Sequence, residues 1–84
     1  MAMKKVRIDV TQRDIERAHA GLCPIERGAK RVLPDPWVGT NSLFLPGMEV
    51  SLPARAVKFV SNFDGGYPVK PFSFTVRVPE AYVR

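Results

Sequence analysis

The sequence predicts a single α+β domain over residues 1–84, with a small antiparallel or mixed sheet and helices packed on one face. Apolar and polar residues alternate near both ends of the chain, as they do in half-buried strands. Helical stripes with typical capping residues lie between these strands. Apolar residues make up 45% of the 84 residues and charged residues 25%, which is ordinary globular usage and enough for one modest core. The expected order of elements is β-α-α-β-β-β-α-β.

The first strand and the first helix are expected to follow each other directly. Apolar side chains occupy every second position of residues 5–10, so one face of this strand should be buried. Thr11 is typical of a helix N-cap, and Asp14 three residues later completes a capping box. The helix is expected over residues 12–20, with Gly21 as its stop.

The second helix is expected to begin after Cys23. Pro24 suits the first helical position, where its missing amide would have no partner. Gly28 weakens this helix by about 1 kcal/mol relative to alanine. Pro34 and Pro36 are expected to end it.

The middle of the chain predicts a meander of three short strands over residues 37–52. Turn residues at 40–42 and at 46–47 separate the strands. A third helix is expected to begin at Pro53, with Ser51 as its cap, and to end at the Asp-Gly-Gly run of residues 64–66.

The last strand, residues 72–78, shows the clearest alternation in the chain. Its aromatic residues faintly resemble the base-stacking strand of RNA-recognition domains, but they share a face with valines and are therefore expected in the core. The residues expected to face the core from the sheet are Val6, Ile8, Val10, Phe72, Phe74 and Val76. The residues expected to cover them from the helices are Ile15, Ile25, Ala29, Val60 and Phe63.

The net charge of +5 is distributed unevenly along the chain. Residues 1–34 carry a net charge of +4, and residues 35–84 carry a net charge of +1. A basic balance favours polyanions, nucleotides or acidic protein surfaces as partners. The alternative is an ordinary solubilising charge, since a net charge of about 2–8 is normal for a small domain. No apolar run is long enough for a membrane span, so no membrane partner is expected.

Catalysis and metal binding are not expected. A single cysteine excludes an intrachain disulfide, and one cysteine with one histidine excludes a self-contained zinc site. Cys23 is expected to fill space before a helix rather than to act as a nucleophile, and His19 is expected on the surface. No phosphate-binding loop or nucleophile motif occurs. The sequence therefore predicts a protein that is not an enzyme and needs no cofactor.

A basic cluster on the second helix is the candidate ligand site. Arg27 and Arg31 lie one turn apart with Lys30 beside them, and Trp37 follows the helix. Arginine forks bind phosphate oxygens, and an indole can stack on a base. The alternative is that these cations only balance the negative end of the helix dipole. The further ligand-binding candidates are Arg55 and Lys58.

Three segments of the chain resemble a family of small bacteriophage proteins, largely without assigned function. The segments are residues 10–15 (VTQRDI), 23–25 (CPI) and 63–74 (FDGGYPVKPFSF). Two positions depart from the family pattern, because Glu26 stands where alanine is frequent and a glycine is displaced to Gly21. The resemblance implies a phage protein made in the cytoplasm of a bacterial host.

Three binding functions are open at this point. The first is a counter-defence sponge that sequesters a nucleotide-type signal through the basic surface, with symmetric chains of a homo-oligomer completing the site. The second is a nucleic-acid-binding protein, which needs a continuous basic stripe. The third is an inhibitor that binds a host protein. The sponge ranks first, because the charge is concentrated in residues 1–34 but is too small for strong non-specific DNA binding.

Overall fold

The computed structural model describes residues 2–18 and 23–84 of the chain. It confirms the α+β class and the predicted order of elements. The bounds are β1 (Met3–Val10), α1 (Gln12–Glu16), α2 (Pro24–Lys30), β2 (Trp37–Val38), β3 (Ser42–Leu45), β4 (Met48–Ser51), α3 (Ala54–Asp64), β5 (Phe72–Pro79) and a final 3₁₀ turn, Glu80–Tyr82. Across the described ranges, no helix is both long and apolar enough to span a membrane.

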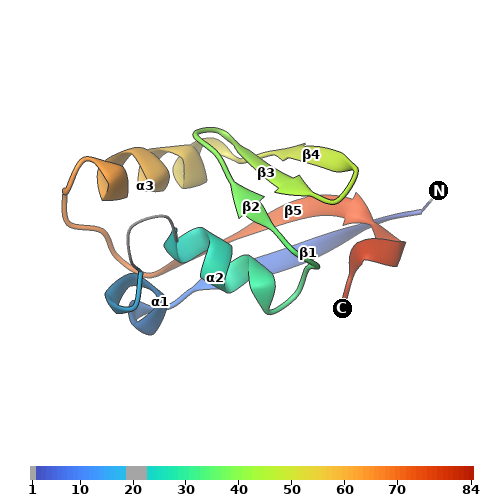
Figure 1. Cartoon of the computed structure of the whole chain (residues 1–84), viewed down its shortest axis with the longest axis horizontal. Coiled ribbons are helices and arrows are strands. Elements are labelled where there is room, and N and C mark those ends of the chain that lie inside the picture. The colour runs from blue at the N-terminus through green and yellow to red at the C-terminus, as the bar shows by residue number, and fades with distance from the viewer. Residues whose placement is uncertain (1, 19–22) are drawn as a thin grey trace.

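The strands form two antiparallel sheets. The first and last strands, β1 and β5, pair along their full length as a two-stranded ribbon, and β2, β3 and β4 form the predicted meander. The ribbon runs along the long axis of the molecule, with α2 in front of it and the meander and α3 along its upper side (Figure 1). The molecule measures 39 × 21 × 20 Å.

The register of the ribbon places every second side chain of both strands on the covered face. Val6 lies opposite Val76, and Ile8 lies opposite Phe74, and all four are buried. Phe72 is partly buried and packs against the same cluster. The expected core face of the sheet is therefore confirmed, and the alternative of an open aromatic platform on β5 is wrong.

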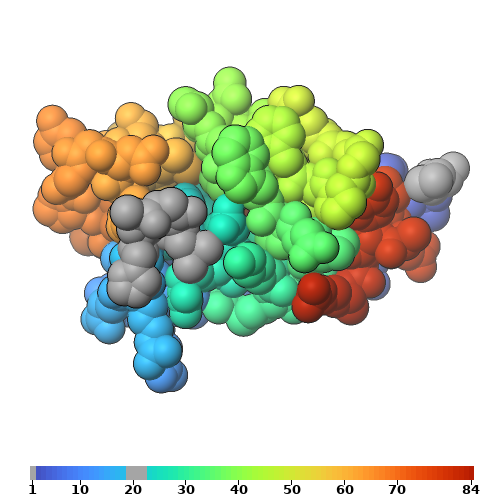
Figure 2. Space-filling view, in the orientation of Figure 1, coloured from blue at the N-terminus to red at the C-terminus, as the bar shows by residue number. Residues whose placement is uncertain are grey.

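The helices cover this core as predicted, with Ile25, Ala29 and Val60 buried and Ile15 and Phe63 packed at its margin. The meander, α2 and the C-terminal segment present closely packed side chains on the face seen in Figure 2. The C-terminal segment is held there by a hydrogen bond from the backbone amide of the last residue to the carbonyl of residue 32.

Three local predictions need correction. The first helix ends at Glu16 rather than at residue 20, because Arg17 already leaves the helical conformation; the predicted stop at Gly21 lies outside the described residues. The third helix begins at Ala54 with Pro53 as its N-cap, and Ser51 belongs to β4 instead of capping the helix.

The second helix also ends earlier than predicted. Lys30 is its last residue, and the amides of Val32 and Leu33 both donate to the carbonyl of Ala29 in the turn that follows. Leu33 in this turn is completely buried. The regular helix therefore ends four residues before Pro34, although Leu33 remains part of the core.

Candidate functional site

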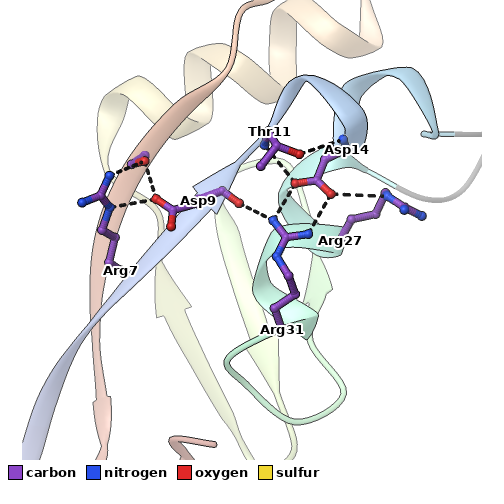
Figure 3. A network of polar contacts seen from close by, with 7 residues as sticks. Arg7, Asp9, Thr11, Asp14, Arg27 and Arg31 are labelled. Atoms are coloured by element: carbon purple, nitrogen blue, oxygen red, sulfur yellow. Dashed lines mark hydrogen bonds and ion pairs between the residues drawn. The ribbon is translucent and has the colours of Figure 1, made fainter.

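The carboxylate of Asp14 in α1 lies beside two of the predicted ligand-binding arginines, Arg27 and Arg31 (Figure 3). Arg31 donates from Nη1 to Asp14 Oδ1 at 2.9 Å and from Nη2 to Asp14 Oδ2 at 2.7 Å. The same Nη2 donates to the backbone carbonyl of Asp9 at 2.7 Å. Arg27 Nε lies 3.6 Å from Asp14 Oδ1. The pair predicted to grip phosphate therefore faces an anion of its own chain.

Asp14 is almost fully buried, and its side chain is only 2% exposed. It also closes the predicted capping box, since Thr11 N donates to Asp14 Oδ2 and Asp14 N donates to Thr11 Oγ1. The hydrogen bonds from Arg31 hold the pKa of the Asp14 carboxyl well below its usual range, although burial acts in the opposite direction. The same bond raises the pKa of Arg31. Asp14 is therefore a charged link between α1, α2 and the end of β1.

The other two members of the predicted cluster are exposed. Lys30 lies on the surface of α2. Trp37 is 58% exposed and packs on Phe44, with ring centroids 5.1 Å apart. The strand that carries Trp37 is tied to α2 by a hydrogen bond from the amide of Val38 to Glu26 Oε1. Trp37 thus lies on the meander, beside α2.

Arg55 and Lys58, the remaining candidates, line a shallow groove of about 290 Å³ between α3 and the segment before β5. We call it the helix groove. Lys70 and the partly buried Phe72 also line it. Arg55 lies over the ring of Phe72, 5.8 Å from the centroid, and donates to the carbonyl of Ser73 at 2.6 Å. The helix groove therefore combines three cations with an aromatic surface.

The outward face of the ribbon carries further basic side chains. Lys5 lies directly opposite Arg77, and Arg7 lies opposite Thr75, and all four are exposed. Successive outward positions along a strand are about 6.6 Å apart. The face that the alternation leaves to solvent is thus positively charged along β1 and β5.

A second shallow groove, of about 390 Å³, connects the ribbon face to the helix groove. Arg7 and Thr75 line it from the ribbon, and Arg55 lines both grooves. The cations therefore form one continuous surface, which we call the basic strip. Its members are Lys5, Arg7, Arg55, Lys58, Lys70 and Arg77.

The basic strip accounts for the net charge of the whole chain. It holds six of the thirteen basic residues, and Asp9 is the one carboxylate on the same ribbon face. The remaining seven basic residues are balanced by the remaining seven acidic ones. The six cations of the basic strip and Asp9 therefore sum to a charge equal to the net charge of the chain.

Asp9 joins the basic strip to the Asp14 cluster. Its Oδ1 accepts from Arg7 Nε at 2.7 Å and from Ser73 Oγ at 2.6 Å, while its backbone carbonyl accepts from Arg31 (Figure 3). The Ser73 and Arg7 hydrogen bonds lower the pKa of Asp9. Asp9 therefore neutralises Arg7 in part and fixes its position on the ribbon.

Cys23 and His19 were the candidates for nucleophilic chemistry or metal binding. Burial raises the pKa of the Cys23 thiol, although the backbone amides of Ile25 and Glu26 act in the opposite direction. His19 lies outside the described residues. Within residues 2–18 and 23–84, no group of three or more metal-binding side chains occurs.

Sequence reasoning missed Lys5, Arg7, Lys70 and Arg77. Part of the signal was present in the alternation that predicted the two outer strands, since Lys5, Arg7 and Arg77 occupy positions between the apolar ones. Only the antiparallel pairing of these strands brings the two sets together.

Comparisons with protein-family models, with curated proteins and with solved structures found no match to this chain.

Proposed function

We propose that this protein binds nucleic acid through the basic strip. The observation that carries the proposal is the gathering of six exposed cations on the ribbon face and along two grooves that join at Arg55. A surface of this kind attracts a phosphate backbone irrespective of sequence, and it releases counterions when it binds.

The shape of the strip favours a polymer over a small enclosed ligand. Both grooves are shallow and open to solvent, and they join at Arg55. Sequestration of a small nucleotide depends on contacts from several sides, whereas a polymer gains affinity from many weak contacts along a surface. Nucleic-acid binding is therefore favoured over the sponge, which the sequence alone ranked first.

The α2 cluster does not carry this proposal. Arg27 and Arg31 already face the Asp14 carboxylate, and a bound phosphate would compete with that ion pair. The cations of the strip are better placed, since Asp9 is the one carboxylate within ion-pair distance of any of the six in the described part of the chain.

The test compares two variants that each lose one lysine and one arginine. Lys5→Gln with Arg77→Gln removes a cross-strand pair of the strip, and Lys30→Gln with Arg13→Gln removes two exposed cations from the helices. Fluorescence anisotropy with a labelled oligothymidylate, over a range of salt concentrations, measures affinity. We expect the strip variant to bind several-fold more weakly, with a slope of log K against log salt that is shallower by about 1.4.

The helix variant is expected to keep the affinity and the salt slope of the wild type. Circular dichroism checks that both variants are folded. Absence of binding by the wild type at low salt would overturn the proposal. An equal or larger loss in the helix variant would also overturn it, because it would place the interface on α1 and α2.

A further inference from the structure

An exposed aromatic ring lies beside the helix groove with no evident role in the fold. Tyr67 is 68% exposed, which makes it the most exposed of the large apolar side chains in the described ranges. Its neighbour in the chain, Pro68, lines the helix groove. A large aromatic ring left in water next to a cationic groove offers a stacking surface for a planar ligand.

The backbone holds Tyr67 in place. Its amide donates to the carbonyl of Asn62, which also lines the helix groove, at 2.9 Å. Gly66 turns the chain with a φ of +78°, a conformation that favours glycine. Gly65 leaves room for the ring, because a Cβ there would lie only 3.0 Å from Tyr67 Cδ2. The ring is thus packed against the end of α3 before any ligand arrives.

The groove that Pro68 lines next to Tyr67 also carries cations. Lys58 and Asn62 lie one turn apart on the face of α3 that borders the groove, and Lys70 follows Tyr67 by three residues. Single-stranded nucleic acids are bound by this combination, in which cations track the backbone and aromatic rings stack on unpaired bases. A duplex keeps its bases stacked on each other and offers none to an exposed ring.

We infer that Tyr67 stacks on an unpaired base at the mouth of the helix groove, which makes the protein selective for single-stranded nucleic acid. The inference rests on the proposed function and deepens it. Duplex DNA has the higher charge density, so a purely electrostatic surface would bind the duplex more tightly. A preference for the single strand is therefore a direct sign of base contacts.

The experiment compares one labelled single strand with its own duplex at the same salt concentration. Wild type, Tyr67→Ala, Tyr67→Phe and Trp37→Ala are each titrated by fluorescence anisotropy. Trp37 is the matched control, since it is also an exposed aromatic residue but lies on β2, whereas Tyr67 directly precedes Pro68 in the wall of the helix groove. We expect the wild type to prefer the single strand and Tyr67→Ala to bind it about tenfold more weakly.

Three further results are expected if the ring acts by stacking. Tyr67→Phe retains the wild-type affinity, Tyr67→Ala leaves duplex binding unchanged, and the salt slope is unaltered because no charge is removed. Trp37→Ala binds as the wild type does. Equal binding of both nucleic acids, an unaffected Tyr67→Ala variant, or a loss confined to Trp37→Ala would each overturn the inference while leaving the basic strip intact. Absence of binding to either nucleic acid would overturn the proposed function itself.

Discussion

Arg31 binds both carboxylate oxygens of Asp14, a residue seventeen positions earlier in the chain, at 2.9 and 2.7 Å. This bidentate pair joins α2 to α1, and the bond from Arg31 to the Asp9 carbonyl extends the link to β1. Because α1 has only five residues, its own helical hydrogen bonds contribute little. The position of α1 therefore depends on its capping box and on this ion pair.

The first prediction concerns the contribution of this pair to stability. Loss of one partner of a buried ion pair costs about 3–5 kcal/mol when it leaves the other charge uncompensated. Arg31 is half-exposed and Arg27 remains near Asp14, so we expect Arg31→Ala to lower the free energy of unfolding by about 2 kcal/mol. Arg31→Lys should recover only part of this loss, because an ammonium cannot form the fork.

Urea denaturation followed by circular dichroism measures these differences. Lys30→Ala is the matched control, since it removes an exposed cation from the same helix, and it should change stability by no more than about 0.5 kcal/mol. Equal effects of Arg31→Ala and Lys30→Ala would show that the pair contributes nothing to the fold.

The second prediction is a loss of stability in acid. The pKa of Asp14 is lower in the folded protein than the value of about 4 in an unfolded chain. Protons therefore bind more readily to the unfolded chain, and the stabilisation by Asp14 is complete above about pH 5. It is progressively lost as the pH falls below about 4.

Urea denaturation between pH 6 and pH 2 checks this dependence. Asp14→Asn should be less stable at pH 6 and should lose less of its remaining stability in acid. Asp9→Asn serves as the comparison, because Asp9 also has a lowered pKa but is exposed. A profile that is as steep in Asp14→Asn as in the wild type would assign the acid sensitivity to other carboxylates.

Local patterns predicted the elements of this fold but not the relationships between distant ones. The alternation around Val6 and Phe74 was sufficient for two half-buried strands, and the spacing of Thr11 and Asp14 was sufficient for a capping box. Each of these signals lies within a few residues along the chain. Arg31, the partner of Asp14, is distant from it in the sequence, and the packing of α1 against α2 brings the two side chains together.

The same reasoning explains why the candidate site in the structure differs from the α2 cluster predicted from the sequence. Counting charge along the chain placed the excess in residues 1–34, and Arg27 and Arg31 were its obvious centre. In space, those arginines meet a carboxylate, while the pairing of β1 with β5 places Lys5 beside Arg77. Two strands separated by more than sixty positions build that surface, and no short window of sequence contains it.

The third prediction concerns the thiol of Cys23. Burial raises the pKa of this thiol, so the folded protein should react with iodoacetamide at pH 7 much more slowly than the urea-unfolded chain does. Cys23→Ser should remain folded, because Cys23 is the N-cap of α2 and serine is a preferred residue there. Its affinity for an oligonucleotide should lie within a few-fold of the wild type. Rapid alkylation of the folded protein, or loss of binding in the folded serine variant, would indicate a chemical role for the thiol.

The fourth prediction concerns Gly28, at the contact between α2 and β1. In an exposed helix, replacing glycine with alanine gains about 1 kcal/mol. Here a Cβ would lie 2.5 Å from the carbonyl oxygen of Asp9 and 3.3 Å from Ile8 Cγ2. Because the first of these atoms belongs to the backbone, α2 would have to move away from β1. We expect Gly28→Ala to lower the free energy of unfolding by about 1–3 kcal/mol, as overpacked sites do.

The displacement should also weaken the bond between Arg31 and the Asp9 carbonyl, which lies at the same contact. Ser61→Ala is the control, since this exposed position in α3 gains helix propensity and meets no opposing backbone. Urea denaturation of the two variants should give shifts of opposite sign. Stabilisation by Gly28→Ala would mean that α2 does not approach β1 so closely, and that the helix tolerates glycine there for another reason.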